Sequence, residues 1–394
     1  MYKKTVFAIS VCLLSIAGVA QTSDITGVLQ EIESNNKELQ AYADLMESRQ
    51  LALVSGNNLP DPVASAYYMP WGDHPGGSYT EFEITQSFEF PTVYGTRRDL
   101  IAKQKGQMAI EYDMLRQDVL LPAKKYLLEV IYLNKRMAVE EMRSQKARQV
   151  YDQVQELFDK EQVGILEVNK AKIAWMQEHF KVDQIENERE NLLLLLKNMN
   201  GGNDVTFVQP AMAEDLNLDA LDSIWEHRQA VDPALKKLKQ QEVIALQQIE
   251  LSKTKALPNL TAGFNYQGVS GVNYSGVYGG LSIPLWSSKN TVKAAEAHYL
   301  YQQSYSDVQL LQVYAEFRKQ YNAYQILLRK FLEYQDTLGN LSSDALLLQS
   351  YELGEISFMD YYIELQFYRQ AYDAMLEMEN QLHQLNAEIL KHQL

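Results

Sequence analysis

The stretch YTEFEITQSFEFP, residues 79–91, carries the pattern that decides the fold. Four of its even positions are apolar: Phe82, Ile84, Phe88 and Phe90. Its odd positions are polar and include three carboxylates: Glu81, Glu83 and Glu89. Because side chains of a strand alternate between its two faces, residues 79–90 are predicted to form a strand with one apolar and one polar face. Such alternation suits either a soluble antiparallel sheet on a core or a membrane barrel with a wet lumen.

Three further strands are predicted, at about 61–69, 259–268 and 274–285. In the first strand of the later pair, Leu260 and Phe264 are apolar and alternate with polar neighbours. The glycine-rich stretches Gly76-Gly77 and Gly268–Gly271 separate the strands of each pair. The sequence therefore predicts two β-hairpins with exposed loops.

Long helices are predicted after each pair of strands. From Thr92 to Asp159 the only turn signal is Pro122, and a helix of this length measures on the order of 100 Å at about 1.5 Å per residue. Apolar side chains recur at spacings of three and four residues there and again from Leu310 to Leu341. This spacing favours coiled-coil packing, and the internal proline is expected to kink its helix.

Two similar halves are indicated by three landmarks that recur in the same order. The landmarks are Leu59-Pro60, Phe90-Pro91 and Gly164 in the first half, and Leu257-Pro258, Ile283-Pro284 and Gly354 in the second half. Their offsets are 198, 193 and 190 residues, which differ only by small insertions. An internal duplication of a helix, a β-hairpin and a helical hairpin is the economical explanation.

The duplication divides the mature chain into a first repeat at 21–222 and a second repeat at 223–394. The helical hairpins would occupy about 92–200 and 288–394, each reversing near its glycine. Residues 201–222 would connect the two repeats. The predicted fold class is therefore mainly α with β.

The N-terminus has the layout of a cleaved secretory signal at residues 1–20. Two lysines precede an apolar run from Val6 to Val19, and small residues follow before Gln21. Cys12 is the only cysteine and lies inside this run after Val11, which disfavours lipidation. Cleavage would leave a chain without thiols, and the loss of two lysines would change its formal net charge from −15 to −17. No later apolar run approaches the about 20 residues of a transmembrane helix, so an exported chain of this kind is either soluble or spans a membrane as a β-barrel.

Composition and motifs exclude several functions. The acidic balance argues against nucleic acid as a partner. The sequence contains no phosphate-binding loop, nucleophile elbow or metal-ligand spacing, so no enzyme, cofactor or metal site is predicted. The six histidines are expected to be solvated surface residues: His74, His179, His227, His298, His383 and His392.

The signal peptide, the duplicated plan and the dipeptides Leu59-Pro60, Phe90-Pro91, Leu257-Pro258 and Ile283-Pro284 together resemble the TolC family of outer-membrane efflux proteins. The resemblance covers essentially the whole mature chain. It implies a homotrimer in outer-membrane lipid, in which four strands from each copy form one twelve-stranded transmembrane β-barrel. The helices would form a long periplasmic coiled-coil barrel. The implied partners are a periplasmic adaptor (membrane-fusion) protein and an inner-membrane pump of RND type or ABC type.

The family's periplasmic tip, where the adaptor docks, lies at the turns of the two helical hairpins. By this resemblance the docking residues are Val163, Gly164 and Ile165 in one turn, and Leu353, Gly354 and Glu355 in the other. Asp360, six residues after Gly354, matches the acidic residue of the family's tip constriction, whereas Lys170 stands six residues after Gly164. Plain turn geometry is the alternative explanation for the glycines and is compatible with docking, and a solvated helix position explains Asp360 as well as a gate does.

The resemblance assigns a passive exit duct. If the even positions of residues 79–90 face lipid, then Glu81, Glu83 and Glu89 face water in the lumen and favour small neutral molecules or metal cations. Two alternatives stay open: a type I protein secretion duct, and a periplasmic coiled-coil scaffold with a soluble β-cap.

Overall fold

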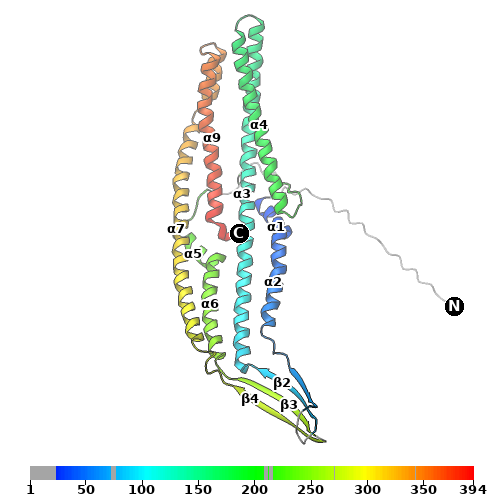
Figure 1. Cartoon of the computed structure of the whole chain (residues 1–394). Helices are drawn as coiled ribbons and strands as arrows, with labels where there is room; N and C mark the ends of the chain where they lie inside the picture. The colour runs from blue at the N-terminus through cyan, green and yellow to red at the C-terminus, as the bar shows by residue number, and fades with distance from the viewer. Residues whose placement is uncertain (1–23, 72–76, 208–211, 213–215, 270, 342) are drawn as a thin grey trace, which may run out of the picture.

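A computed structural model describes residues 24–71, 77–207, 212, 216–269, 271–341 and 343–394. The predicted signal peptide, Cys12 and Gly76 lie outside the described residues. The chain is a long rod whose helices run along its length in both directions, with a small sheet at one end (Figure 1). The prediction of a mainly helical fold with a small sheet is confirmed.

The four strands form one antiparallel sheet in the order β1-β2-β3-β4. They are β1 (Val63–Met69), β2 (Tyr79–Phe88), β3 (Asn259–Val269) and β4 (Val272–Ser282). The hairpins of the two halves therefore pair side by side, with β2 against β3. The predicted loop at Gly268–Gly271 is shorter than expected, because Gly268 pairs with Asn273 inside the sheet.

In each half, two helices precede the pair of strands along the chain and the long helices follow it. The first half contains α1 (Ile25–Asn35), α2 (Lys37–Ser55), α3 (Pro91–Asp159) and α4 (Ile165–Met199). The second half contains α5 (Leu221–Val231), α6 (Pro233–Thr254), α7 (Thr291–Gly339), α8 (Ser343–Glu352), α9 (Phe358–Ile389) and the short 3-10 helix η1 (Lys391–Gln393).

The two longest helices differ in continuity. Helix α3 has 69 residues and runs through Pro122 as one helix. The helix of the second half was predicted to continue to the glycine turn, but α7 ends at Gly339 and the 10-residue α8 starts separately. Glycine and asparagine at positions 339 and 340 explain this break, because both are poor helix formers. Leu341, placed in the predicted heptads, lies outside the helices.

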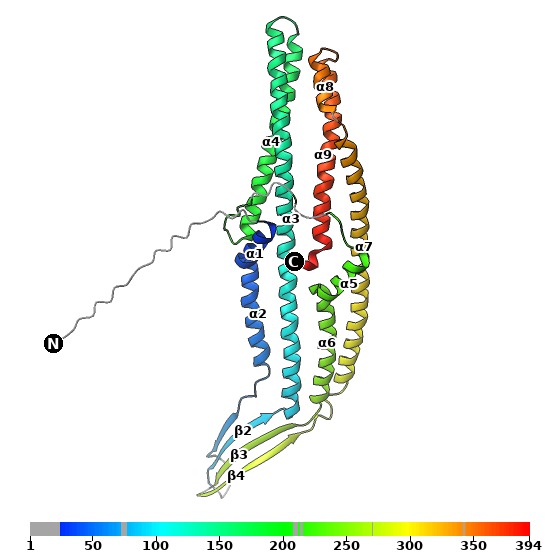
Figure 2. The ribbon, with the colours of Figure 1, turned by 180° about the vertical axis from the view of Figure 1, so that it is seen from behind.

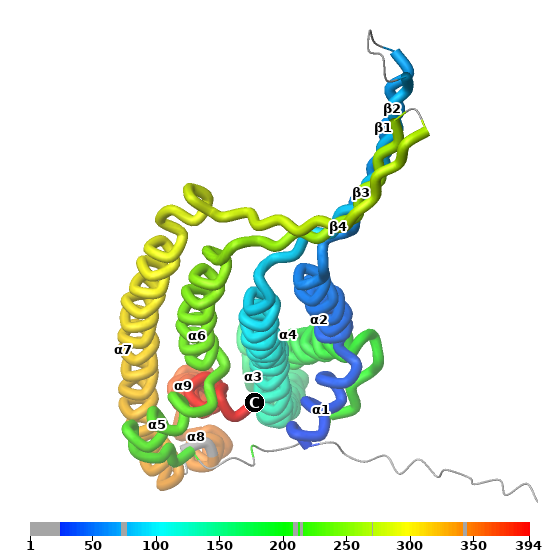
Figure 3. Tube along the Cα trace, turned by 90° about the horizontal axis from the view of Figure 1, so that it is seen from below, coloured from blue at the N-terminus to red at the C-terminus, as the bar shows by residue number. Residues whose placement is uncertain are grey.

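The helices lie in two tiers that share α3 and α7. Next to the sheet, α2, α3, α6 and α7 stand in a row, and nearer the other end α4, α3, α9 and α7 or α8 do so (Figures 1 and 2). Seen from below, the row is curved and the sheet projects beyond it (Figure 3). Helix α3 thus links the sheet to the far end of the rod.

Buried apolar residues form four separate clusters along this rod. One surrounds α1, α3 and the end of α4, and a second lies between the two helical tips. A third joins α5, α7 and α9, and a small fourth packs α3 on α6 beside the sheet. The rod is therefore held together section by section, as expected for long coiled-coil packing.

Candidate membrane face and helical tips

One face of the sheet is apolar and exposed. Cross-strand pairing aligns Ile84, Phe264 and Val277 in one row. The row on one side contains Phe82 with Tyr266, the row on the other contains Gln86 with Ala262 and Gly279, and the row beyond that contains Phe88 with Leu260 and Leu281. Val277 is 86 % exposed, although it belongs to the row with the most apolar side chains. A large exposed apolar face on a sheet marks a surface that interacts with a protein partner, a membrane or a ligand.

The opposite face is polar and carries two of the predicted carboxylates. Glu81 accepts hydrogen bonds from Asn265 at 2.6 Å, from Tyr79 at 2.8 Å and from Gln267 at 3.3 Å. Glu83 accepts hydrogen bonds from Thr85 at 3.1 Å and from Tyr278. These contacts fix both carboxylates on the polar face of the sheet.

Glu89 differs from the other two carboxylates. Strand β2 ends at Phe88, so Glu89 lies beyond it, and its carboxylate pairs with Arg97 at 2.5 Å. The charge of Glu89 is therefore compensated within the same chain. Periodicity alone could not reveal this, because Arg97 comes from the first turns of α3.

A close approach between β3 and β4 shapes the polar face. The ring of Tyr278 lies over Gly263, where a Cβ atom would come within 2.5 Å of it. Glycine is required there for the ring to cross its strand. This position lets the Tyr278 hydroxyl reach Glu83 and Thr85 on β2.

The helical tip of the second half is a glycine turn. Gly354 has a φ of +76°, and its N–H donates to the Tyr351 carbonyl at 2.9 Å. The N–H of Glu355 donates to the Ser350 carbonyl at 2.9 Å, which completes a Schellman motif. Leu353 caps the end of α8 beside it and is exposed.

The helical tip of the first half makes the same turn without glycine. Glu161 is the residue with positive φ, at 60°, and its N–H donates to the Phe158 carbonyl at 2.8 Å. Gly164, assigned the turning role from the sequence, has an extended φ of −85° and caps the start of α4. Gly164 and Gly354 are therefore not equivalent, and that expectation was wrong.

The two tips align at an offset of 193 residues. Glu161 corresponds to Gly354, and the N-cap Gly164 corresponds to the N-cap Ser357. At this offset Asp360 corresponds to Glu167, not to Lys170. Asp360 and Glu167 each stand three positions after the N-cap of their helix, where the helix dipole favours a carboxylate. The same offset relates Phe90-Pro91 to Ile283-Pro284, and this was the signal in the sequence that could have found Glu161, Glu167 and Ser357.

Asp360 is held by its own cap. The Ser357 hydroxyl donates to the Asp360 carboxylate at 2.6 Å and accepts from the Asp360 N–H at 3.2 Å. Asp360 remains exposed, so this N-cap leaves part of its carboxylate open to solvent.

A cavity of about 620 Å³ lies between the two tips. Among the predicted docking residues, Val163 and Gly354 line it, whereas Ile165 and Leu353 are exposed outside it. Its apolar lining residues are Val154, Leu157, Val163, Ile356, Phe358 and Met359. Its charged lining residues are Glu156, Lys160, Glu167 and Glu352, so the net charge of the lining is negative.

Buried ion pairs join the two helical hairpins below this cavity. Glu178 on α4 is 0 % exposed and accepts from Arg369 on α9 at 2.9 Å. Burial raises the pKa of the Glu178 carboxyl, but Arg369 and Lys181 outweigh burial and hold the pKa below its usual value. Arg143 on α3 pairs with Asp373 on α9 at 2.8 Å.

Two histidines depart from the expectation that all are solvated, whereas His227 is exposed. His383 and His392 are buried, and His392 Nε2 lies 3.1 Å from His227 Nδ1. Burial, with His227 and Arg228 nearby, lowers the pKa of His392. His74 lies outside the described residues, whereas His179 and His298 are exposed.

The described residues contain no helix with both the length and the apolar composition needed to cross a membrane. Nor does this part of the chain hold a group of three or more His, Cys, Asp or Glu side chains able to bind a metal ion.

Comparison with known proteins rests on structure. No protein-family model matches the sequence, and no curated protein matches it either. The CmeC outer membrane channel of Campylobacter jejuni aligns with a TM-score of 0.72 at 14% identity, over 100% of this chain and 93% of that one. The outer membrane protein VceC of Vibrio cholerae aligns with a TM-score of 0.71 at 14% identity, over 93% of this chain and 95% of that one.

The open-state MtrE outer membrane channel of Neisseria gonorrhoeae aligns with a TM-score of 0.67 at 13% identity, over 93% of this chain and 88% of that one. These alignments extend over nearly the full length of every chain compared. The chain therefore has the fold of the CmeC and MtrE outer membrane channels and of the outer membrane protein VceC.

Proposed function

We propose that this chain is a TolC-family outer-membrane channel of a tripartite efflux system, a passive trimeric duct through which small molecules or metal cations leave the cell. The observation that carries the proposal is the sheet, whose exposed apolar face lies opposite a face of hydrogen-bonded carboxylates. A membrane barrel with a polar lumen has this arrangement. The shared fold with solved outer-membrane channels supports the same function.

A trimer would provide the strand pairing that the edges of the sheet lack in a single copy. Strands β1 and β4 stand at the two ends of the sheet, so each pairs on one side only within the described chain. Four strands cannot close a barrel, and unpaired edges are unfavourable in lipid. Pairing of β4 in one copy with β1 in the next would close twelve strands and would place α7 of one copy beside α2 of its neighbour, extending the helical row into a periplasmic barrel.

The helical tips are the proposed docking site for a periplasmic adaptor, which would connect the duct to an inner-membrane pump. The lining of the cavity between the tips combines apolar side chains with three glutamates and one lysine. An adaptor helix that presents apolar side chains with a basic residue beside them would complement both features. Val163, Gly164, Ile165, Leu353, Gly354 and Glu355 would lie at or near this contact.

Lumen charge supports cationic or neutral cargo. Glu81 and Glu83 would form six carboxylates per trimer on the inner wall, whereas Glu89 is neutralised by Arg97. The formal net charge of −15 per chain acts in the same direction.

The membrane assignment is tested by fractionating cells that express the chain. The protein should sediment with outer membranes, require detergent for extraction and migrate as a trimer that heating dissociates. A monomer that is soluble in plain buffer would instead support the coiled-coil scaffold.

Cargo is tested with a deletion strain. Increased sensitivity to drugs, detergents or metal salts, restored by the intact gene, would support efflux. Unchanged sensitivity with loss of a secreted protein would instead identify a type I secretion duct.

Charge reversal with Glu81→Lys and Glu83→Lys, compared with Glu89→Lys, should lower the cation preference of single-channel currents, with the smallest change for Glu89→Lys.

A further inference from the structure

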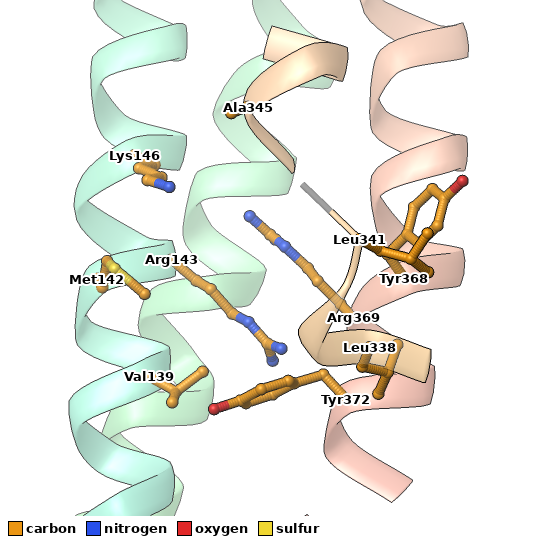
Figure 4. A pocket seen from close by; sticks show the side chains of 10 residues that line it. All are labelled: Val139, Met142, Arg143, Lys146, Leu338, Leu341, Ala345, Tyr368, Arg369 and Tyr372. Atoms are coloured by element: carbon orange, nitrogen blue, oxygen red, sulfur yellow. The ribbon is translucent and has the colours of Figure 1, made fainter. Parts of the chain in front are cut away.

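A cavity of about 340 Å³ lies where α7 ends, between the tips and the middle of the rod (Figure 4). Its walls come from α3, the end of α7, α8 and α9 of a single chain. The apolar lining residues are Val139, Met142, Leu338, Leu341 and Ala345. This size is at the small end of the range of ligand pockets, which is about 300–1,000 Å³.

Three cationic side chains converge on this cavity. Arg143 and Lys146 extend from α3, and Arg369 extends from α9 toward them (Figure 4). Arg369 is 5 % exposed, and its Nη1 binds Glu178, yet its Nε has no hydrogen-bond partner among the described residues. A buried guanidinium N–H without an acceptor is unfavourable, so this donor indicates a missing acceptor.

The charges around the cavity do not cancel. Arg143 is matched by Glu140 and Asp373, and Arg369 by Glu178, which Lys181 also contacts. With Lys146, this group of described residues has four cations and three carboxylates, of which only Arg143, Lys146 and Arg369 line the cavity. Tyr368 and Tyr372 add two aromatic rings to the lining.

We propose that this cavity binds a small amphipathic monoanion, a carboxylate or sulfonate on an apolar body. The anionic group would accept from Arg369 Nε and pair with Lys146. The apolar body would lie against Met142, Leu338 and Leu341. A monoanion balances the excess positive charge, and the apolar walls exclude a purely inorganic ion as the best ligand. This site lies within one chain, so it is independent of the proposed channel function.

The direct test is calorimetric titration of the mature protein in a maltoside detergent with 2-naphthalenesulfonate, corrected by a detergent-only titration. Naphthylmethanol, naphthylmethylammonium and inorganic sulfate serve as neutral, cationic and non-apolar probes. The sulfonate should bind at one site per chain, and the other three should bind at least tenfold more weakly. Absence of sulfonate binding, or equal binding of the cation, would overturn the proposal.

Variants locate the site. Lys146→Gln removes one solvent-facing cation and should weaken sulfonate binding about fivefold, as a partly exposed ion pair does. Arg369→Lys keeps the charge beside Glu178 but removes Nε, and it should weaken binding further. Leu341→Trp should abolish binding by filling the cavity. Lys330→Gln, on the separate groove between α7 and α9, is the matched control and should leave binding unchanged. Equal effects of Lys146→Gln and Lys330→Gln would place the ligand elsewhere.

Discussion

The two halves of the chain build the same helical tip from different residues. In the second half Gly354 adopts the left-handed conformation and Ser357 caps the next helix. In the first half Glu161 and Gly164 occupy these two places. The shared feature is the pattern of backbone hydrogen bonds, and the second half has the residues that suit this pattern better.

The halves also differ at the junction between the helices that begin each half and the helix that ends it. In the first half Asn36 caps α2 and donates to the Met199 carbonyl at 2.9 Å. In the second half Asp232 caps α6, while His227 on α5 faces His392 after α9. Amide side chains do not titrate near neutral pH, whereas imidazoles do, so the same junction is insensitive to pH in one half and sensitive in the other.

The largest expected effect comes from breaking the buried ion pair between Arg369 and Glu178, which joins the two halves. Arg369→Met leaves Glu178 buried without its main partner and should lower the free energy of unfolding by about 3–5 kcal/mol. Denaturant unfolding followed by circular dichroism measures it. Lys319→Met removes an exposed pair with Glu316 and is the control, with an expected change of less than about 1 kcal/mol. Similar losses for both variants would contradict the buried role of Arg369.

One substitution made at both tip glycines should have opposite effects. Gly354→Ser forces a side chain into the left-handed conformation and should cost about 1–2 kcal/mol. Gly164→Ser introduces a better N-cap in an open position and should stabilise by a few tenths of a kcal/mol. Thermal unfolding of the two variants side by side checks the signs. Destabilisation of both would mean that Gly164 is also a turn residue.

Glu161→Gly should remove the main difference between the tips. Relief of the left-handed glutamate should stabilise the first tip by about 1 kcal/mol. Hydrogen exchange at residues 157–162 is a local readout, and Glu156→Gly, inside α3, is a control that should destabilise instead. Unchanged or faster exchange in Glu161→Gly would show that the glutamate makes a compensating contact.

The smallest expected effect is the pH response of the histidine junction. Because the folded-state pKa of His392 is lowered, its contribution is fully present above the unfolded pKa of about 6.5 and is lost as the pH falls below that value. Unfolding measured from pH 7.5 to pH 5.5 should therefore show a decline that His392→Asn reduces. Asn36→Ala should weaken the first junction without changing this pH dependence. An unaltered slope in His392→Asn would exclude the pair as its source.

Regular alternation made the sheet predictable. The strand at residues 79–90 could be read from Glu81, Phe82, Glu83 and Ile84, because a period of two has no other simple cause. The order of the prolines likewise indicated a duplication, which remains a prediction. The breaks were harder to place, because α7 stops at the Gly339-Asn340 pair whereas α3 continues through Pro122, which is the stronger helix breaker.

Contacts between distant segments could not be predicted from one sequence. The Glu89–Arg97 pair, the burial of His392 and the cavity near Arg369 depend on which helix faces which. Glu161 escaped notice because a glutamate rarely adopts a positive φ, so glycine attracted the turn assignment. Glu167, the acidic counterpart of Asp360, was missed for the same reason, because aligning Gly164 with Gly354 gives the wrong offset between the halves.

The four separate clusters of buried side chains have a consequence for how this rod loses structure. Each section carries its own apolar contacts, so opening one section exposes only that section's surface. The cluster between the tips, at the far end from the sheet, can therefore loosen while the strands and the middle of the rod keep their packing. Amide protection should accordingly change in steps along α3, although this helix is unbroken from end to end.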